Sequence, residues 1–350
     1  MKQLLLAYTL RPSFKTGGSE MLNVLLLLTM VFLSRPVGVF GQTRFLHSHS
    51  GTSSTQVAIW AAKDLGIFAK YGLDLDLVFI PGGARTMQAL LSGSIQSADS
   101  DGVGPVNAIL RGGDAVIVAG LINRSLFKFV AQKELTNPAQ LRNKKIGVAN
   151  FGGSNEFAVL LALKEWNISR DQVTLVAAGG SAVRLAAMEN HGLDATVLPY
   201  DHALLASRAG MKILADIPEL VPAFPDKVIT VRRSFLDKDR PTVKRYLQAL
   251  SEAIYQVATN REKATDILRK RLKLSDPKAA EENYNIYGGN YSYPPRVGKS
   301  GLVGVLEQIQ AQSPGAKGDF ELKRFLDESV IDELEREGFF KKLPPKDNRR

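Results

Sequence analysis

The chain has 350 residues, and 45% of them are hydrophobic, which excludes wholesale disorder and leaves room for two domains. The formal net charge is +10, of which residues 1–41 carry +3 and residues 341–350 carry +4, so the body carries only +3. The basic tail could touch nucleic acid or anionic lipid, but we expect a solvated tail and no nucleic-acid partner. The absence of cysteine excludes disulfides and the lipid-modified cysteine of a bacterial lipoprotein.

The N-terminal region contains an uncharged apolar run at residues 21–33. Its length is typical of a signal-peptide core and short for a membrane span. Basic residues precede it, and residues 39–41 offer a small-residue cleavage site. We therefore predict that residues 1–41 are a cleaved signal peptide, with an uncleaved anchor as the alternative. An exported chain without a lipid anchor stays near the cell only behind an outer membrane, which favours a Gram-negative periplasm.

From residue 43 the chain repeats one theme: a short apolar strand, a polar turn and an amphipathic helix. The predicted strands of the first half are residues 43–47, 73–80, 97–100 and 116–121. The predicted helices are residues 57–71, 84–91 and 103–110. Strands that alternate with helices are typical of an α/β fold with parallel pairing.

The theme restarts after residue 123, and its character changes after residue 225. The second set of predicted strands is residues 127–131, 145–149, 173–177, 195–198 and 212–215. The helices between them are predicted to start at residue 154 and to span residues 182–189 and 203–209. Residues 228–232 can form one more strand, whereas residues 240–350 have a helical pattern. We expect those helices to form a cap on the first half.

The turn at residues 151–154 has the composition of a binding loop. Two glycines end the strand, and Ser154 or Asn155 is predicted to cap the helix. The free N–H groups at such a helix start hold a carboxylate, a phosphate or another acceptor. The lysine of a phosphate-binding loop is missing, and the Gly-x-Ser-x-Gly pattern of a nucleophile elbow ends instead in Glu156. The turn therefore indicates binding without catalysis, or a plain strand-to-helix connection.

Polar turns follow almost every predicted strand. In open α/β sheets, ligands bind outside the carboxyl ends of the strands, so the turns of two facing halves would line one cleft. We predict that a small-molecule ligand is contacted by residues of these turns: Ser53, Ser54, Gly83, Ser100, Asp101, Asn123, Phe151, Gly153, Ser154, Ser181 and Tyr200.

The titratable residues leave few catalytic options. His47 and His49 would share one face of a strand and could ligate a metal, but no cluster of acidic residues stands at ligand spacing. We expect structural histidines, no metal and no cofactor. Asp99 and Asp101 could work as acid and base, but we favour a cap on the helix that starts at residue 103 or a hydrogen bond to a ligand amine. Arg85 and Arg124 either meet a ligand carboxylate or lie on the surface.

Several stretches between residues 43 and 340 carry a family resemblance. They are Ala61-Ala-Lys-Asp-Leu-Gly-Ile-Phe-Ala-Lys-Tyr-Gly-Leu-Asp-Leu75, Gly82-Gly with Gln88-Ala-Leu-Leu-Ser-Gly93, Lys145-Ile-Gly-Val148 with Gly153-Ser154, and Gly192-Leu-Asp-Ala-Thr-Val197. With them the chain resembles the substrate-binding proteins of ABC importers in the nitrate/sulfonate/taurine group, whose branch is also called NMT1/THI5-like. Two features depart from the family: Ser94-Ile-Gln96 lacks the usual acidic residue, and the cysteine-rich motif of the branch that makes the thiamine pyrimidine is absent.

The resemblance implies a two-lobed type II periplasmic-binding-protein fold, or Venus flytrap, with a helical C-terminal extension. Lobe one would be residues 43–123 plus 225–350, and lobe two residues 124–224. Such a protein is a monomer that captures a small organic or anionic molecule and delivers it to an ABC permease in the inner membrane, without catalysis. The alternatives are an enzyme that acts on a heterocycle, with Asp101 or His49 as base, and a ligand-sensing subunit of a signalling receptor. The identity of the ligand does not transfer.

Overall fold

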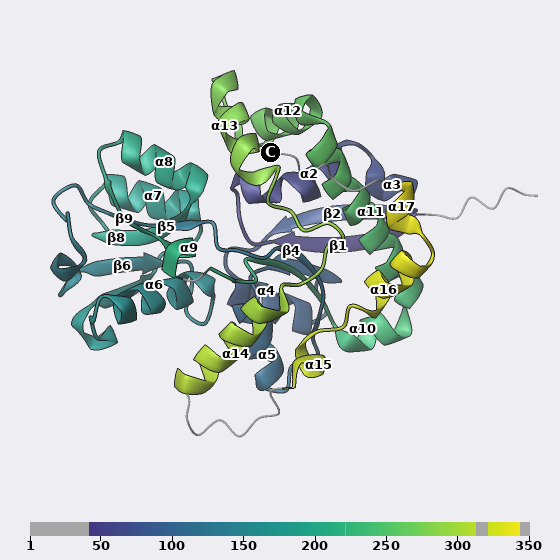
Figure 1. Ribbon diagram of the computed structural model, residues 1–350, viewed down its shortest axis with the longest axis horizontal. Helices are drawn as coiled ribbons and strands as arrows, with labels where there is room; N and C mark the ends of the chain where they lie inside the picture. The colour runs from purple at the N-terminus through teal and green to yellow at the C-terminus, as the bar shows by residue number, and fades with distance from the viewer. Residues whose placement is uncertain (1–41, 221, 313–320, 344–350) are drawn as a thin grey trace, which may run out of the picture. The chain divides into compact units, whose positions relative to one another are not determined.

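The computed structural model describes residues 42–220, 222–312 and 321–343. The predicted signal peptide, residues 1–41, and the basic tail from residue 344 lie outside the described residues. Two five-stranded mixed sheets, each covered by helices on both faces, form two lobes (Figure 1). The described part is therefore an α/β structure of two lobes, as predicted.

The first lobe is built on a sheet of strand order β2-β1-β3-β10-β4. Its strands are β1 (Thr43–His49), β2 (Leu73–Phe79), β3 (Ser97–Ser100), β4 (Val116–Ile122) and β10 (Lys227–Val231). β1 pairs in parallel with β2 and β3, whereas β10 lies antiparallel between β3 and β4. β10 comes much later in the chain than its neighbours β3 and β4, so the chain returns to the first lobe after it has formed the second.

The second lobe is built on a sheet of strand order β7-β6-β8-β5-β9. Its strands are β5 (Phe127–Ala131), β6 (Lys145–Val148), β7 (Thr174–Ala177), β8 (Ala195–Pro199) and β9 (Lys212–Asp216). β6 pairs in parallel with β7 and β8, and β5 lies antiparallel to β8 and β9.

The prediction of purely parallel pairing was therefore wrong in one strand of each sheet, and the crossing of the chain explains why. β5 and β10 are the strands that the chain forms directly after it passes from one sheet to the other. A strand that follows a crossover helix within one sheet runs parallel to the strand before it. A strand that enters from the other lobe starts instead at the edge where the parallel strands end, so it runs against them.

Helices cover both faces of the first sheet, and the alternation of side chains along the strands supplies a core on each face. Phe45 on β1 belongs to one core and its neighbour Leu46 packs against the other. The first face carries α2 (Val57–Asp64), α3 (Ile67–Lys70), α10 (Arg233–Lys238), α11 (Arg240–Thr259), α12 (Arg261–Leu272), α13 (Pro277–Tyr287), α16 (Ser329–Arg336) and α17 (Phe339–Lys342). The second carries α4 (Gly83–Leu91), α5 (Val103–Leu110), α14 (Lys299–Gln312) and α15 (Leu322–Phe325). The expected helical cap on the first lobe is thus present.

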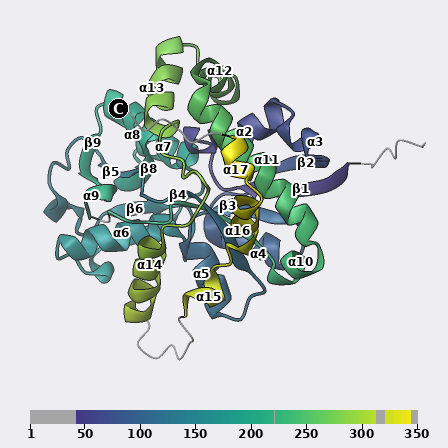
Figure 2. The same ribbon diagram turned by 45° about the vertical axis from the view of Figure 1, so that its right-hand side comes forward.

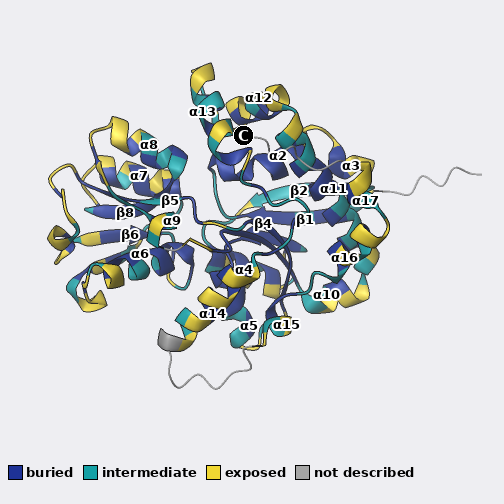
Figure 3. Cartoon of the chain, viewed as in Figure 1, coloured by how far each residue is buried: buried dark blue, intermediate teal, exposed yellow. Residues whose placement is uncertain are grey.

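The second sheet has the same two-faced construction. Its first face packs on α6 (Ser154–Glu165) and α9 (Ile217–Leu220), and its second on α7 (Ser181–Glu189) and α8 (Tyr200–Arg208). Figure 2 shows α6 on the side of this sheet opposite α7 and α8. The strands of both sheets are mostly buried beneath these helices (Figure 3). Three short 3-10 helices complete the described elements: η1 (Ser54–Gln56), η2 (Pro138–Leu141) and η3 (Arg170–Gln172).

Two local predictions were wrong because of glycine. The predicted single helix over residues 57–71 is broken at Gly66, whose φ of +68° places it in the left-handed region that ends a helix. The N-cap of α6 is Gly153 and not Ser154 or Asn155, and no side chain caps that position. A serine one residue inside the helix cannot accept the hydrogen bonds that an N-cap side chain accepts.

Candidate functional site

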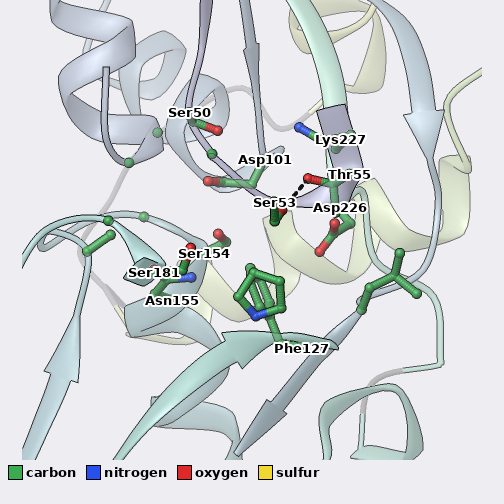
Figure 4. A pocket seen from close by; sticks show the side chains of 18 of the residues that line it. Ser50, Ser53, Thr55, Asp101, Phe127, Ser154, Asn155, Ser181, Asp226 and Lys227 are labelled. Carbon is green, nitrogen blue, oxygen red and sulfur yellow. Dashed lines mark hydrogen bonds between the residues drawn. The ribbon is translucent and has the colours of Figure 1, made fainter. Parts of the chain in front are cut away.

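A polar cavity of about 80 Å³ lies between the two lobes, at the edge where the parallel strands of both sheets end. The first lobe contributes the loop after β1, the turns after β2 and β3, and the start of β10. The second lobe contributes the start of β5 and the turns after β6, β7 and β8. In Figure 4, Asp101, Asp226 and Lys227 lie on one side of the cavity, and Ser154, Asn155 and Ser181 on the other. The predicted convergence of polar turns is therefore present.

Three helices begin at this cavity. The first residues of α4, α6 and α7 line it, and each of these helices has a glycine N-cap, at Gly82, Gly153 and Gly180, without a side-chain cap. Glycine at these positions leaves the N–H groups of each first turn without a partner from the cap side chain. Such helix starts favour an acceptor or an anion because of their exposed N–H groups and the helix dipole.

Lys227, which lines the cavity on the side of the first lobe, belongs to a buried ion pair. The ammonium of Lys227 lies 2.7 Å from Oδ1 of Asp99, and both side chains are almost fully buried. The amide of Gln56 completes the group: it donates to Oδ2 of Asp99 at 2.8 Å and accepts from Nζ of Lys227 at 2.7 Å. Burial raises the pKa of the Asp99 carboxyl, and the nearby Lys227 ammonium opposes that rise. Lys227 is therefore already hydrogen-bonded to a carboxylate and to an amide.

Asp101 bonds to the start of α5, as the sequence suggested, although the N-cap residue itself is Gly102. Its Oδ1 accepts hydrogen bonds from the backbone N–H groups of Val103 at 2.9 Å and Gly104 at 3.0 Å. Its Oδ2 lies beside Gly83, where a Cβ atom would come within 2.7 Å of it. One oxygen of Asp101 therefore holds α5 in place while the carboxylate lines the cavity.

Arg184 on α7 is a buried guanidinium on the side of the second lobe. Nε donates to Oγ1 of Thr196 at 3.0 Å, Nη2 donates to the carbonyl of Val197 at 3.0 Å, and Nη1 donates to the carbonyl of Gly179. The side chain is only 1% exposed, and burial lowers the pKa of Arg184 to about 9. Its partners here are neutral, so its positive charge is not matched by a carboxylate among them.

Hydrogen bonds join the lobes around the cavity. Oδ2 of Asp201, at the start of α8, accepts from the N–H of Ser54 at 2.9 Å and from its hydroxyl at 3.1 Å. The hydroxyl of Tyr287, on α13, donates to Oδ1 of Asp201 at 3.3 Å. Burial alone would raise the pKa of Asp201, but hydrogen bonds from His202 and from the N–H of Ser54 outweigh it and hold the pKa below its usual value. We call this group of Ser54, Asp201 and Tyr287 the interlobe latch.

A second contact between the lobes is made by Asn150, which lines the cavity. The side-chain amide of Asn150, in the turn after β6, donates to the carbonyl of Pro81 in the first lobe at 3.0 Å. It packs against Gly82, where a Cβ atom would lie 1.8 Å from Nδ2 of Asn150. Gly82 also has a φ of +83°, so both its conformation and its contact require glycine. The structure therefore shows the lobes in a closed arrangement.

Six of the eleven predicted ligand residues line the cavity: Ser53, Gly83, Asp101, Gly153, Ser154 and Ser181. The structure places the other five elsewhere. Ser54 belongs to the interlobe latch, the hydroxyl of Ser100 donates to the carbonyl of Asp101, and the side chain of Asn123 bonds to the backbone of residues 296 and 298. Phe151 is half exposed on a separate groove, and Tyr200 packs beneath the ammonium of Lys128. Contact of the first six with a ligand stays a prediction.

Sequence reasoning missed several polar residues of the cavity: Thr55, Gln56, Asn150, Arg184, Asp226 and Lys227. Asn150 follows a strand end and could have been found by extending the turn at residues 151–154 by one position. Arg184 lies one turn inside a helix, Lys227 begins the strand that runs against its neighbours, and Asp226 directly precedes that strand. No rule about the carboxyl ends of parallel strands would have indicated these three.

The histidines and the two arginines are not brought together. His47 Nδ1 lies 2.7 Å from Oγ of Ser97 and 3.1 Å from the hydroxyl of Tyr246, and burial holds its pKa well below the usual value. His49 Nδ1 bonds to the carbonyl of Gly51 at 2.8 Å. Arg85 and Arg124 are exposed and lie outside the cavity. In the described ranges, no three His, Cys, Asp or Glu side chains gather into a group that could hold a metal ion.

The strand orders, the antiparallel strand in each sheet and the shared cavity define a two-lobed binding protein of the type II periplasmic kind. Solved structures agree: a protein of Bordetella bronchiseptica matches with a TM-score of 0.76 at 17% identity, over 85% of this chain and 98% of that one. The nitrate-binding protein NrtA of Synechocystis PCC 6803 matches with a TM-score of 0.67 at 17% identity, over 88% and 92% of the two chains. At these identities the likeness shows the fold alone.

The sequence comparison goes further. The profile described as "NMT1/THI5 like" matches residues 54–264, and the chain belongs to this family. A Brucella abortus protein named as a binding protein is 30% identical over 248 residues, which cover 69% of this chain and 74% of that protein. The family resemblance noted in the sequence is thus confirmed. Among the described residues, no helix is both long enough and apolar enough to cross a membrane.

Proposed function

We propose that this chain is the solute-binding component of an ABC importer, which captures a small polar molecule in the cavity between its lobes. One observation carries the proposal: both lobes supply polar walls to one cavity, and hydrogen bonds between the lobes close over it. A ligand that contacts both walls is fully bound only in the closed arrangement. Its binding energy therefore shifts the equilibrium between open and closed states.

The helix starts indicate what part of the ligand binds to the second lobe. The first turns of α6 and α7 present N–H groups beside the hydroxyls of Ser154 and Ser181, with the guanidinium of Arg184 behind them. These groups are donors, so this side of the cavity suits an acceptor or an anionic group of the ligand. Proteins of the same fold support the reading, since one is a nitrate-binding protein and another is an alkanesulfonate-binding protein bound to MOPS.

The proposal includes no catalysis. The two aspartates considered as an acid–base pair have other partners: Asp99 is paired with Lys227, and Asp101 accepts hydrogen bonds from the first N–H groups of α5. His49, the other candidate base, bonds to a backbone carbonyl, and burial lowers its pKa. We expect the concentration of each candidate ligand to stay constant during prolonged incubation with the protein. Formation of a product would contradict this expectation.

Export and delivery also belong to the proposal. The chain would lose residues 1–41, act as a periplasmic monomer and pass its ligand to a permease in the inner membrane. Its lobes would divide at residues 123–124 and 224–225. Mass spectrometry of the protein from a periplasmic fraction tests the first part: a mature N-terminus near residue 42 is expected, and a membrane-bound chain that retains the leader would contradict it.

A pair of matched variants tests the binding site. Ser154→Trp would fill the cavity at the start of α6, whereas Ser207→Trp places the same side chain on the exposed face of α8 in the same lobe. Small anions and amino compounds are first screened by thermal shift on the unaltered protein, and the hits are titrated by calorimetry. We expect Ser154→Trp to abolish binding and Ser207→Trp to preserve it. Equal affinity in both variants would place the binding site elsewhere.

A further inference from the structure

Two residues that line the cavity each have a buried oxygen atom without a hydrogen-bond partner: Oδ1 of Asp226 and Oδ1 of Asn150. Both residues are more than nine-tenths buried, with exposed fractions of 9% and 8%. Buried polar atoms without a partner are rare in folded proteins, because each forfeits its hydrogen bonds to water without replacement. Both atoms are acceptors, so what each lacks is a donor.

The two acceptors come from opposite lobes. Asp226 directly precedes β10 of the first lobe, and Asn150 follows β6 of the second. The amide of Asn150 is held in one orientation, because its Nδ2 donates to the carbonyl of Pro81 at 3.0 Å. Turning the amide over would break this contact between the lobes. The oxygen of Asn150 is thus the atom left for the cavity.

A backbone hydrogen bond from Leu126 acts on the Asp226 carboxyl, but no donor of the described residues reaches its Oδ1. Its nearest ammonium, on Lys227, is already bonded to Asp99 and Gln56. The negative charges of Asp101 and Asp99 raise the pKa of Asp226. The charge of Asp226 in turn raises the pKa of the Tyr287 hydroxyl. The first lobe therefore contributes the carboxyl groups of Asp101 and Asp226 to the cavity lining, whereas the second lobe contributes the donor-rich starts of α6 and α7.

We propose that the ligand carries a nitrogen with at least two N–H bonds, as in a primary ammonium, an amidinium or an amino-heterocycle, and that Asp226 and Asn150 accept hydrogen bonds from it. This deepens the proposed function and rests on it. Because the two acceptors belong to different lobes, the nitrogen bridges the lobes and stabilises the closed arrangement. Asp226 is then a specificity-determining residue: a ligand with oxygen in place of this nitrogen would leave Oδ1 of the buried carboxyl without a donor.

The ionisation of Asp226 adds a pH signature. Burial raises the pKa of Asp226 to about 7; Lys227 and a backbone hydrogen bond from Leu126 oppose the rise, and Asp101 and Asp99 add to it. A cationic nitrogen stabilises the ionised carboxylate, so binding below pH 7 breaks the O–H bond of Asp226 and releases its proton to solvent. From the pKa alone, the affinity should fall about tenfold between pH 8 and pH 6, because only the ionised fraction binds without that cost.

The test uses two pairs of probes that exchange an amino nitrogen for oxygen: cytosine and uracil, and 3-aminopropanoate and 3-hydroxypropanoate. Each is titrated by calorimetry into the unaltered protein, Asp226→Asn and the exposed control Asp237→Asn at pH 8 and pH 6. We expect a nitrogen member to bind at least tenfold more tightly than its oxygen partner, and this preference to be lost in Asp226→Asn only. An oxygen partner that binds equally well, with binding still abolished by Ser154→Trp, would overturn this inference and leave the proposed function standing.

A second measurement needs no ligand. If Oδ1 of Asp226 lacks a donor in the free protein, Asp226→Asn should raise the melting temperature at pH 8 and not at pH 4. If another group of the protein already satisfied the carboxylate, the substitution would lower the melting temperature at pH 8. That second result would overturn the inference even if no probe binds.

Discussion

The interlobe latch allows closure to be weakened without touching the cavity. Asp201→Ala removes the acceptor of three hydrogen bonds from the first lobe, two from Ser54 and one from Tyr287. The hydroxyl of Ser54 has only one proton, which it shares between Asp201 and Oδ1 of Asn283 at 2.9 Å. Its hydrogen bond to Asp201 therefore contributes less than a full bond. Hydrogen bonds to charged groups contribute about 1.5–3 kcal/mol each, and water replaces them in the open state. We expect the closed state to lose about 3 kcal/mol, which corresponds to about 100-fold in the open–closed equilibrium constant.

The absence of cysteine makes this prediction easy to measure. Asp237→Cys on α10 and Glu189→Cys at the end of α7 place one exposed spin label on each lobe. Dipolar spectroscopy then reports the distance between the lobes. In the Asp201→Ala background, the population at the short distance should fall and a longer distance should appear, while the melting temperature changes little because each lobe keeps its own core.

Arg208→Ala is the matched control. The ion pair of Arg208 with Glu282 also joins the lobes, at 3.1 Å, but its side chains are 53% and 45% exposed. Exposed ion pairs contribute about 0.2–1 kcal/mol, so this variant should shift the distances only slightly. An unchanged distance distribution in Asp201→Ala, or an equal effect of Arg208→Ala, would refute the reasoning that burial makes the latch strong.

Four further outcomes are expected. In denaturant titrations, the unaltered protein should lose stability as the pH rises from about 4 to 7, and Asp226→Asn should not show this loss. The rise of the Asp226 pKa from the ordinary 3.8 to about 7 corresponds to on the order of 4 kcal/mol of unfolding free energy, which is present below the unfolded pKa and lost above the folded one. Gly82→Ala should lower the closed population seen by spin labels, because its Cβ would clash with Asn150. Ser154→Ala should cost about 1 kcal/mol of ligand affinity by calorimetry but leave the melting temperature unchanged, because its side chain caps nothing. Asn123→Ala should lower the unfolding free energy by about 1–2 kcal/mol, through two lost hydrogen bonds to the backbone, and leave affinity intact.

Much of the fold followed from periodicity. The spacing of apolar residues placed α5 and β5 at the residues where they occur, and the helices beyond residue 240 were recognised as a cap. The direction of β5 and β10 did not follow, because pairing direction depends on where the chain crosses between lobes. The break at Gly66 was missed because apolar spacing continues through it, and only the left-handed conformation of the glycine ends the helix.

The sequence predicted the residues of the candidate site that lie in turns after strands. It did not predict which side chains point into the cavity and which bond elsewhere. Turns after strands supplied Asp101, Ser154 and Ser181, and all three line the cavity. Ser54 lies in such a turn too, but its hydrogen-bonding groups bond to Asp201 across the lobes. The orphaned oxygen of Asp226 is a property of its surroundings, since Lys227 is taken by Asp99, and no pattern in the sequence records that competition.

The most direct test of a captured small molecule is native mass spectrometry of the protein after incubation with a small-molecule fraction of bacterial growth medium. The unaltered protein and Ser207→Trp should each retain one bound molecule per chain, and folded Ser154→Trp should retain none. A bound molecule that persists in Ser154→Trp, or a chain that retains nothing under conditions where it is folded, would contradict the assignment of the cavity as a ligand-binding site.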